Sequence, residues 1–201
     1  MLNPTLSPLS TNVPHAMDRI DSQRGFSLIE VSIVTAIVLL LAIIAIPAVG
    51  TYVIENKVPK IGEELARFVL QTQINALPGS TSPYADIATS HLATMVSDSS
   101  IFSVGTTGGV TSVLHGLGRD GTVEVASADS GASFSLTLNK VSHAACPSLA
   151  SIMQRLAHTI TISNAGGSSA TVKSDSQDYS ALSAESHCAK GDVNSFVFLA
   201  R

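Results

Sequence analysis

The sequence contains no tryptophan and few other aromatic residues. Aromatic side chains make up 4% of its 201 residues, although 45% of the residues are hydrophobic. Because aromatic side chains dominate the buried area of most cores, a core here has to be built from Val, Leu, Ile and Ala. We therefore expect a single folded domain of modest size with a narrow margin of stability.

Basic residues are also scarce. Lys and Arg number 11 against 15 Asp and Glu, which gives a net charge of −4. Nucleic-acid binding without sequence preference depends on a broad basic face that neutralises phosphates. Direct binding of nucleic acid is therefore not expected, although a local basic patch is compatible with this charge.

Patterns typical of hydrolases and nucleotide-binding enzymes are missing as well. The chain has no Gly-x-Ser-x-Gly nucleophile elbow and no carboxylate pair at a recognisable spacing. Residues 116–121 have the letters of the dinucleotide fingerprint G-x-G-x-x-G, but strand-like residues 122–125 follow them instead of a helix. We interpret this stretch as a turn and expect neither catalysis nor a cofactor.

Only two cysteines are present, Cys146 and Cys188, and two interpretations of them are open. With His143 and His187 they supply four possible zinc ligands. However, adjacent residues rarely bind one metal together, and the spacing is not that of a zinc finger or ribbon. A disulfide is favoured and no metal is expected. The other histidines are scattered and are expected on the surface or on helix flanks: His91, His115 and His158.

One long apolar run dominates the N-terminal part of the chain. Val31 to Val49 is a stretch of about 19 residues without a charge, long enough as a helix to cross a hydrocarbon core of roughly 30 Å. Glu30 lies at its outer end. An ionisable group at the edge of a membrane span is costly and marks a functional site whose partner has to be found.

The residues before this run set it apart from an ordinary secretory signal. Arg24 and Gly25 precede the apolar run, whereas a signal peptide carries its cleavage site after it. Gly25-Phe26-Ser27-Leu28-Ile29-Glu30 resembles the processing site of type IV prepilins. The resemblance implies that a dedicated peptidase cuts between Gly25 and Phe26, methylates the new N-terminus at Phe26, and leaves the apolar segment in the mature protein. A plain single-pass anchor is the alternative.

The resemblance also implies a role for Glu30 in filament assembly. Once exposed by cleavage, Phe26 bears a positive amine, and Glu30 follows it by four residues, a helical spacing. In a medium of low dielectric constant the amine of a neighbouring subunit is a strong partner for this carboxylate. Such a pair would fix the axial register of helices whose apolar flanks otherwise slide. The alternative is a pair within one chain that only neutralises the start of the helix.

Residues 1–25 are interpreted as a leader peptide. They contain several prolines and serines and no sustained apolar period. Their length is similar to the long leaders of the type IVb subgroup, whereas Phe26 after the cut is commoner in type IVa. A start at Met17 would give a short leader that ends at the same glycine.

The orientation of the leader predicts the compartment in which the cysteines lie. Arg19 and Arg24 favour a leader on the cytoplasmic side, which places both thiols in an oxidising compartment. A bridge that closes a loop of about 43 residues stabilises a fold by roughly 4 kcal/mol in the chain-entropy model.

We expect one long helix over residues 26–77, with 31–49 as its transmembrane part and filament core. Apolar residues at spacings of three and four continue the helical period well beyond the span. Pro47 and Pro59 are predicted helix breaks at which the helix bends or loosens, together with Gly50 and Gly62, which lower helix propensity. Residues 78–80, Pro-Gly-Ser, are expected to end it.

Residues 78–201 are predicted to form the globular head. A short helix is expected from Ser82-Pro83. An extended piece over 110–114 and a hairpin with its turn at 129–131 follow. A helix is expected to begin at Cys146-Pro147, followed by a second hairpin near 160–173. The apolar run 194–200 predicts a strand inside the sheet that is covered on both faces.

These features predict an α+β fold, a long N-terminal membrane-spanning helix packed against an antiparallel sheet, as in type IV pilins. The resemblance implies a structural subunit for adhesion, aggregation or conjugative transfer, similar to type IVb pilins of adhesive or conjugative thin pili. Expected partners are further copies of the chain, the prepilin peptidase/methyltransferase, the inner-membrane pilus assembly machinery and, before assembly, the lipid bilayer. The precursor is expected in the bacterial inner membrane and the mature protein in an extracellular pilus. The alternatives are a pseudopilin of a type II secretion system and a membrane-anchored periplasmic enzyme or binding protein that does not assemble.

Overall fold

A computed structural model of the chain describes residues 25–201, with only the backbone of residues 47 and 48. Residues 1–24 of the predicted leader (1–25), including Met17, lie outside the described residues. The chain divides into two compact units, Met1–Ile43 and Ile44–Arg201. We call the second the head unit and describe each unit by itself.

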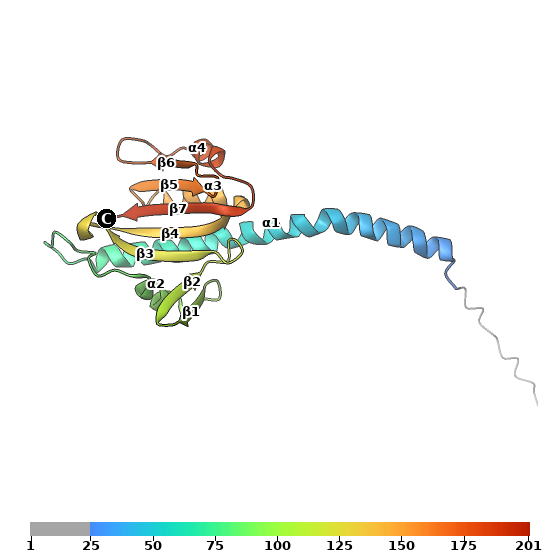
Figure 1. Ribbon diagram of the computed structural model, residues 1–201, viewed down its shortest axis with the longest axis horizontal. Helices are drawn as coiled ribbons and strands as arrows, with labels where there is room; N and C mark the ends of the chain where they lie inside the picture. The colour runs from blue at the N-terminus through green and yellow to red at the C-terminus, as the bar shows by residue number, and fades with distance from the viewer. Residues whose placement is uncertain (1–24) are drawn as a thin grey trace, which may run out of the picture. The chain divides into compact units, whose positions relative to one another are not determined.

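Helix α1, Leu28–Ile74, is the longest element (Figure 1). Its first backbone hydrogen bond is donated by the Val31 N–H to the Ser27 carbonyl at 3.1 Å. The helix ends at Ile74, three residues before the predicted end, and turns follow it before Pro78.

The predicted bend or loosening of the helix at Pro47 and Pro59 stays a prediction. α1 continues through both prolines. A proline removes one donor from the helix ladder, but the hydrogen bonds of the flanking turns keep the helix continuous.

Within the head unit, one face of α1 is buried. Val58, Ile61, Leu65, Phe68 and Val69 recur at the predicted spacing and are each at most 3% exposed. Burial of this stripe, rather than helix propensity alone, holds this part of α1 in place.

The sheet of the head unit has seven antiparallel strands in the order β1-β2-β3-β4-β7-β5-β6. Their bounds are β1 Ser103–Thr107, β2 Val110–Leu114, β3 Thr122–Ala128, β4 Ser133–Ser142, β5 Thr159–Asn164, β6 Ser169–Lys173 and β7 Asp192–Ala200. The predicted hairpins are confirmed: β3 pairs with β4 around the 3-10 turn η1, Asp129–Gly131, and β5 pairs with β6. The predicted extended piece is β2.

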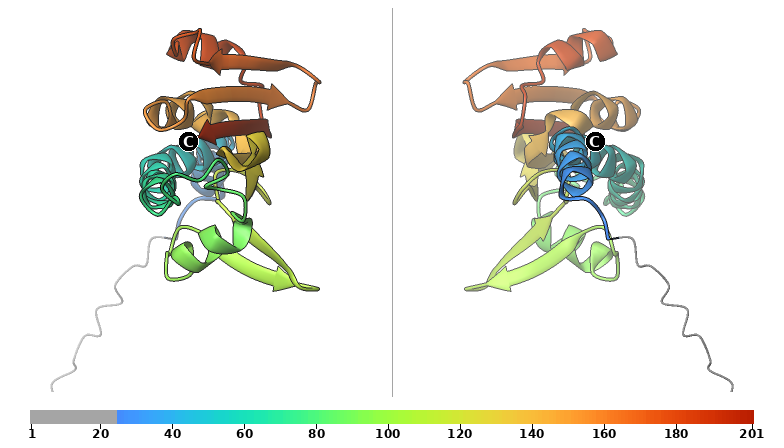
Figure 2. Two further views of the ribbon diagram at one scale, coloured as in Figure 1. Left: turned by 90° about the vertical axis from the view of Figure 1, so that its left-hand side faces the viewer. Right: turned by 90° about the vertical axis from the view of Figure 1, so that its right-hand side faces the viewer.

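The last strand lies inside the sheet, as predicted, because β7 pairs with β4 and β5. The prediction that it is covered on both faces is wrong. Phe196, Phe198 and Ala200 are buried, whereas the residues between them are only half-buried. An antiparallel sheet tolerates one partly solvated face, and Figure 2 shows the helices of the head unit gathered on the other.

Three short helices complete the head unit: α2, Thr89–Val96; α3, Cys146–Met153; and α4, Ala181–Ser186. α3 begins at the predicted Cys146-Pro147, preceded by the 3-10 turn η2, His143–Ala145. α2 begins seven residues later than Ser82, because the Tyr84 N–H is bonded to the Gly131 carbonyl at 2.9 Å, which docks this segment on the β3–β4 turn. Strand β1 and helix α4 were not predicted.

The few aromatic residues concentrate in the core. Phe134 of β4 packs edge-on against Phe68 of α1, with ring centroids 6.4 Å apart, and against Tyr84 at 5.0 Å. Phe196 and Phe198 of β7 stack at 5.5 Å. The remaining core is mainly aliphatic, as the composition predicts.

Candidate functional site

The candidate processing site lies immediately before α1. Gly25 and Phe26 precede the first helical residue, and Phe26 is 81% exposed. A Cβ added at Gly25 would meet no atom within 4 Å. Nothing in the described chain therefore requires a glycine at this position, so any requirement for glycine comes from a partner.

Glu30 is the third residue of α1 and lies in its first turn. A carboxylate at this position is favoured by the unpaired N–H groups and the positive end of the helix dipole. Phe26 lies two residues before the first helical residue, Leu28. The prediction assumed that Phe26 and Glu30 are on one regular helix, but only the last part of this interval is helical. Glu30 is exposed, and no ion pair joins it to another described residue.

The surface of α1 after Glu30 is apolar on all sides. No charged residue occurs between Glu30 and Glu55, a stretch of about 36 Å of helix. Its large apolar side chains are mostly exposed, from 76% at Ile43 to 44% at Val53. Among the described residues, α1 alone is long and apolar enough to span a membrane, with a mean hydropathy of 2.9 in its most apolar window.

The hydroxyl groups near the start of this surface are satisfied within the helix. Ser32 Oγ donates to the Ile29 carbonyl at 2.9 Å, and Thr35 Oγ1 donates to the Val31 carbonyl at 2.7 Å. Because these hydroxyls need no water, they do not oppose burial of this face in lipid or among other helices.

The predicted disulfide between Cys146 and Cys188 is confirmed, with Cα atoms 6.1 Å apart. It joins the first residue of α3 to the segment before β7. Both thiols are used in this bond, so neither is available as a thiolate ligand. No group of three or more possible metal ligands occurs among the described residues.

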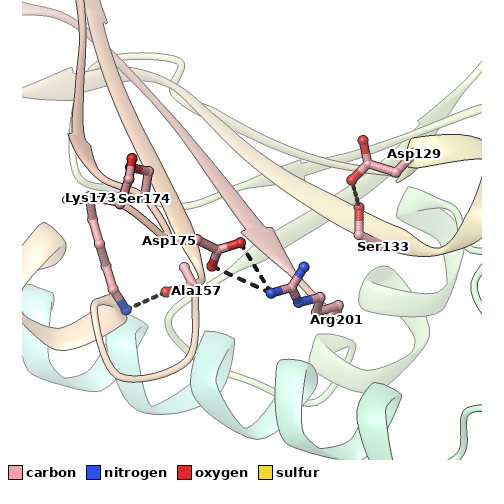
Figure 3. A network of polar contacts seen from close by, with 8 residues as sticks. Asp129, Ser133, Ala157, Lys173, Ser174, Asp175 and Arg201 are labelled. Carbon is pink, nitrogen blue, oxygen red and sulfur yellow. Dashed lines mark hydrogen bonds and ion pairs between the residues drawn. The ribbon is translucent and has the colours of Figure 1, made fainter. Parts of the chain in front are cut away.

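A polar cluster lies beside β6 and β7 (Figure 3). Lys173 donates to the carbonyls of Gln154 and Ala157, at and just beyond the C-terminal end of α3, the latter at 2.7 Å. Arg201 forms an ion pair with Asp175 at 3.2 Å. Lys173 thus joins β6 to the C-terminal end of α3, whereas the Arg201–Asp175 pair is exposed and contributes little to stability.

His115 is the residue that sequence reasoning misplaced. It was expected on the surface and is 0% exposed, with both ring nitrogens hydrogen-bonded. Burial lowers its pKa below the usual 6.5. The one available signal was the cluster of glycines that follows it, which we interpreted only as a turn.

A groove of about 550 Å³ between α1 and residues 82–95 was also not predicted. Phe68, Ala76, Ile87 and Met95 form its apolar lining. The acceptor nitrogen of His91 is used to cap α2, where it accepts the Ala88 N–H at 3.1 Å. No sequence pattern indicated this groove, because its apolar residues fall on the predicted core faces.

Two family models match the chain, in agreement with this arrangement. A family model described as PilS N terminal matches residues 68–201, and one described as the prokaryotic N-terminal methylation motif matches residues 20–46. A type IV b pilin from Salmonella typhi is similar in structure, with 20% identity, a TM-score of 0.48, and coverage of 69% of this chain and 94% of that one. No curated protein matches the sequence. Since the PilS match covers more than half of the chain and the methylation motif covers Gly25, Phe26 and Glu30, the chain belongs to the PilS family and is a type IV pilin.

Proposed function

We propose that this pilin is the structural subunit of a type IV pilus of the type IVb subgroup. The observation that carries the proposal is the order of parts at the N-terminus: Gly25, then Glu30, then a helix surface without a charge as far as Glu55. A helix that is apolar all round is stable only in lipid or among other helices. The disulfide near the C-terminal end supports the IVb subgroup.

Processing is proposed to occur between Gly25 and Phe26, with N-methylation of Phe26 by the prepilin peptidase/methyltransferase. The methylation-motif match over residues 20–46 supports this step. Before assembly, α1 would hold the subunit in the inner membrane with the head unit on the far side from the leader, and the assembly machinery would then pass it into an extracellular filament. Adhesion, aggregation and conjugative transfer are the proposed uses of that filament.

Glu30 is proposed to pair with the Phe26 amine of a neighbouring subunit. The exposed, unpaired carboxylate in the first turn of α1 supports this assignment. The helix dipole offsets only part of the cost of burying a carboxylate, because it acts as about half a unit charge. A neighbour's amine offsets more, and it also defines one axial position for each incoming helix.

Replacement of Glu30 tests the proposal. In cells that carry only Glu30→Ala, we expect membrane insertion and cleavage at normal levels, because removal of a charge makes the span more apolar. We expect filaments to be lost, because the incoming amine would be buried without its partner at a cost of several kcal/mol. Glu55→Ala is the matched control: Glu55 is the next carboxylate along α1, is also exposed, and lies beyond the apolar run.

The measurement is the amount of subunit in filaments sheared from the cells, compared with processed subunit in the membrane fraction. Normal filaments in Glu30→Ala would show that Glu30 has no assembly role. Absence of the wild-type chain from sheared filaments would contradict the pilus itself and favour a secretion-system pseudopilin or an anchor that does not assemble.

A further inference from the structure

His115 lies at the junction of β2 and β3, in the interior of the head unit. It follows the last residue of β2, and its backbone N–H donates to the Gly121 carbonyl at 3.0 Å. The β2–β3 ladder has only two residue pairs, Val113 with Val123 and Leu114 with Thr122. The bond from His115 therefore extends a very short ladder and closes the loop 115–121.

Two hydrogen bonds hold the His115 ring, one accepted by the ring and one donated by it. Nδ1 accepts the backbone N–H of Leu117 at 3.0 Å, and Nε2 lies 2.9 Å from the backbone carbonyl of Asn139. A backbone N–H only donates and a carbonyl only accepts. These partners therefore require the neutral ring with its proton on Nε2.

The glycines of the loop allow the backbone to close over this ring. A Cβ at Gly121 would lie 2.2 Å from His115 Cε1, and one at Gly118 would lie 2.0 Å from the Lys140 carbonyl. Side chains at these positions would overlap the ring or β4. Close packing thus explains Gly118 and Gly121 of the G-x-G-x-x-G letters, and a φ of 63° explains Gly116.

We propose that residues 115–121 form a pH-sensitive latch, which protonation of His115 opens. A proton taken from solvent binds Nδ1, the atom that accepts the Leu117 N–H. Two N–H groups then point at each other, and the bond between them is lost. The charged ring also lies in a buried site, where the charged form is disfavoured.

Opening of the latch would affect more than the loop. Leu117 is 0% exposed, and its carbonyl accepts the Ser142 N–H at 2.8 Å. Release of Leu117 therefore frees the end of β4 and exposes an apolar side chain. It also removes the third connection between β2 and β3, which weakens the attachment of the β1–β2 hairpin to the sheet on the β3 side.

The charges around the latch have mixed signs, so they do not reverse this effect. They come from every element beside it: Lys57 of α1, Arg119 and Asp120 of the loop, Glu124 of β3, Lys140 of β4 and Asp192 of β7. Asp192 favours protonation, but its Oδ2 already accepts the Arg119 N–H at 2.8 Å. Burial outweighs it, and the pKa of His115 is lowered.

Because the pKa of His115 is lowered in the closed latch, the latch is expected to open at low pH. The ring binds a proton less tightly in the closed latch than in the open one, where the pKa is about 6.5. The open population therefore rises as the pH falls below about 6.5, by up to tenfold per pH unit, until the pKa of the closed form is reached. Above about pH 7 it stays constant.

Amide hydrogen exchange of the full-length mature protein in detergent micelles, measured from pH 5 to 8, tests this proposal. After correction for the intrinsic rate, the opening constant at the Leu117 amide is expected to increase several-fold between pH 7 and 5.5. His115→Asn is expected to remove this increase, because the Asn oxygen accepts the Leu117 N–H but does not titrate. His91→Asn is the matched control, since His91 Nδ1 also accepts a backbone N–H but on an exposed side chain, and it should leave the increase intact.

A pH-independent opening constant at Leu117 in the wild type, or an unchanged increase in His115→Asn, would overturn the proposal. Should His115→Asn fold poorly, nitrogen NMR of the wild-type histidines provides a second measurement. We expect the Nε2–H tautomer at pH 7.5 and a titration midpoint below 6.5, with Leu117 protection falling as the pH is lowered from 6.5 to that midpoint. The Nδ1–H tautomer, or a midpoint at or above 6.5, would be incompatible with the latch.

Discussion

At the scale of single residues, several glycines of this chain have assignable physical reasons, and these reasons differ. Gly121 and Gly118 leave space for neighbouring atoms. Gly79 and Gly167 have φ of 78° and 80° in turns, a conformation that favours glycine. Neither reason applies to Gly25 within the described chain. Its glycine is therefore explained by the enzyme proposed to cut after it.

Replacement of Gly25 by valine is therefore expected to leave the head unit folded and the precursor uncut. The proposed peptidase needs close access to the backbone at this bond, and a branched side chain blocks it. Intact-mass spectrometry of the membrane fraction should show the leader retained, while thermal unfolding of the head unit is unchanged. Gly79→Ala is a suitable contrast, because its positive φ is strained for alanine, so it lowers stability slightly but leaves processing normal. A mature N-terminus other than Phe26 in the wild type would refute the assignment.

At the scale of elements, α1 illustrates how one helix serves two environments. Its first half is exposed and apolar on all sides, and its second half buries a single stripe against the sheet. The glycines in the two halves differ accordingly. A Cβ at Gly50 would meet nothing within 4 Å, whereas one at Gly62 would lie 2.7 Å from Ile152 Cγ2 of α3.

Gly62→Ala should therefore destabilise the head unit although alanine is the better helix former. The gain in helix propensity is about 1 kcal/mol, and overpacking against α3 costs about 1–3 kcal/mol. We expect a net loss of about 1 kcal/mol, visible as a lower urea midpoint. Gly50→Ala brings the same propensity gain without the contact and should leave the midpoint equal or higher. Equal midpoints for both variants would mean that α1 and α3 are not closely packed at Gly62.

The elements also show what sequence patterns can and cannot predict here. The stripe from Ile61 to Val69, the two hairpins and the start of α3 at Cys146-Pro147 follow from local period and turn chemistry. β1 was missed because Gly105 and three Ser or Thr residues give it no apolar alternation, and only pairing with β2 makes it a strand. The start of α2 was misplaced because a distant turn at Gly131 holds Tyr84.

The candidate site divides in the same way. Gly25, Phe26 and Glu30 were proposed from sequence because they lie close together in the chain and follow a specific pattern. His115 was not found because its environment is made by Asn139 of β4 and by the loop glycines, so its burial is a tertiary property. Local sequence predicts chemistry that is contiguous, and it fails for residues that the sheet brings together.

At the scale of the whole molecule, the disulfide is the main covalent constraint on a core with few aromatic side chains. Cys146 is 0% exposed and Cys188 is half-buried, and the bridge joins α3 to the segment that leads into the interior strand β7. Closing a loop of this length is worth about 4 kcal/mol in the chain-entropy model, and measured values are typically about 2–4 kcal/mol. Since small domains have unfolding free energies of about 5–15 kcal/mol, loss of the bridge should lower the unfolding free energy of the whole head unit by a large fraction.

A double-mutant cycle tests this expectation, with the variants Cys146→Ser, Cys188→Ser and both changes together. Each single change breaks the same bond, so the double variant should be little less stable than Cys146→Ser, far from the sum of the two single losses. Cys146→Ser should be the worse single variant, because it buries a hydroxyl at a fully enclosed site. Urea unfolding of the full-length chain gives the free energies, and cleavage at Gly25 should be unaffected because the bridge lies in the head unit. Additive losses would show that the two cysteines stabilise the protein separately, through packing, and that the bridge between them contributes little.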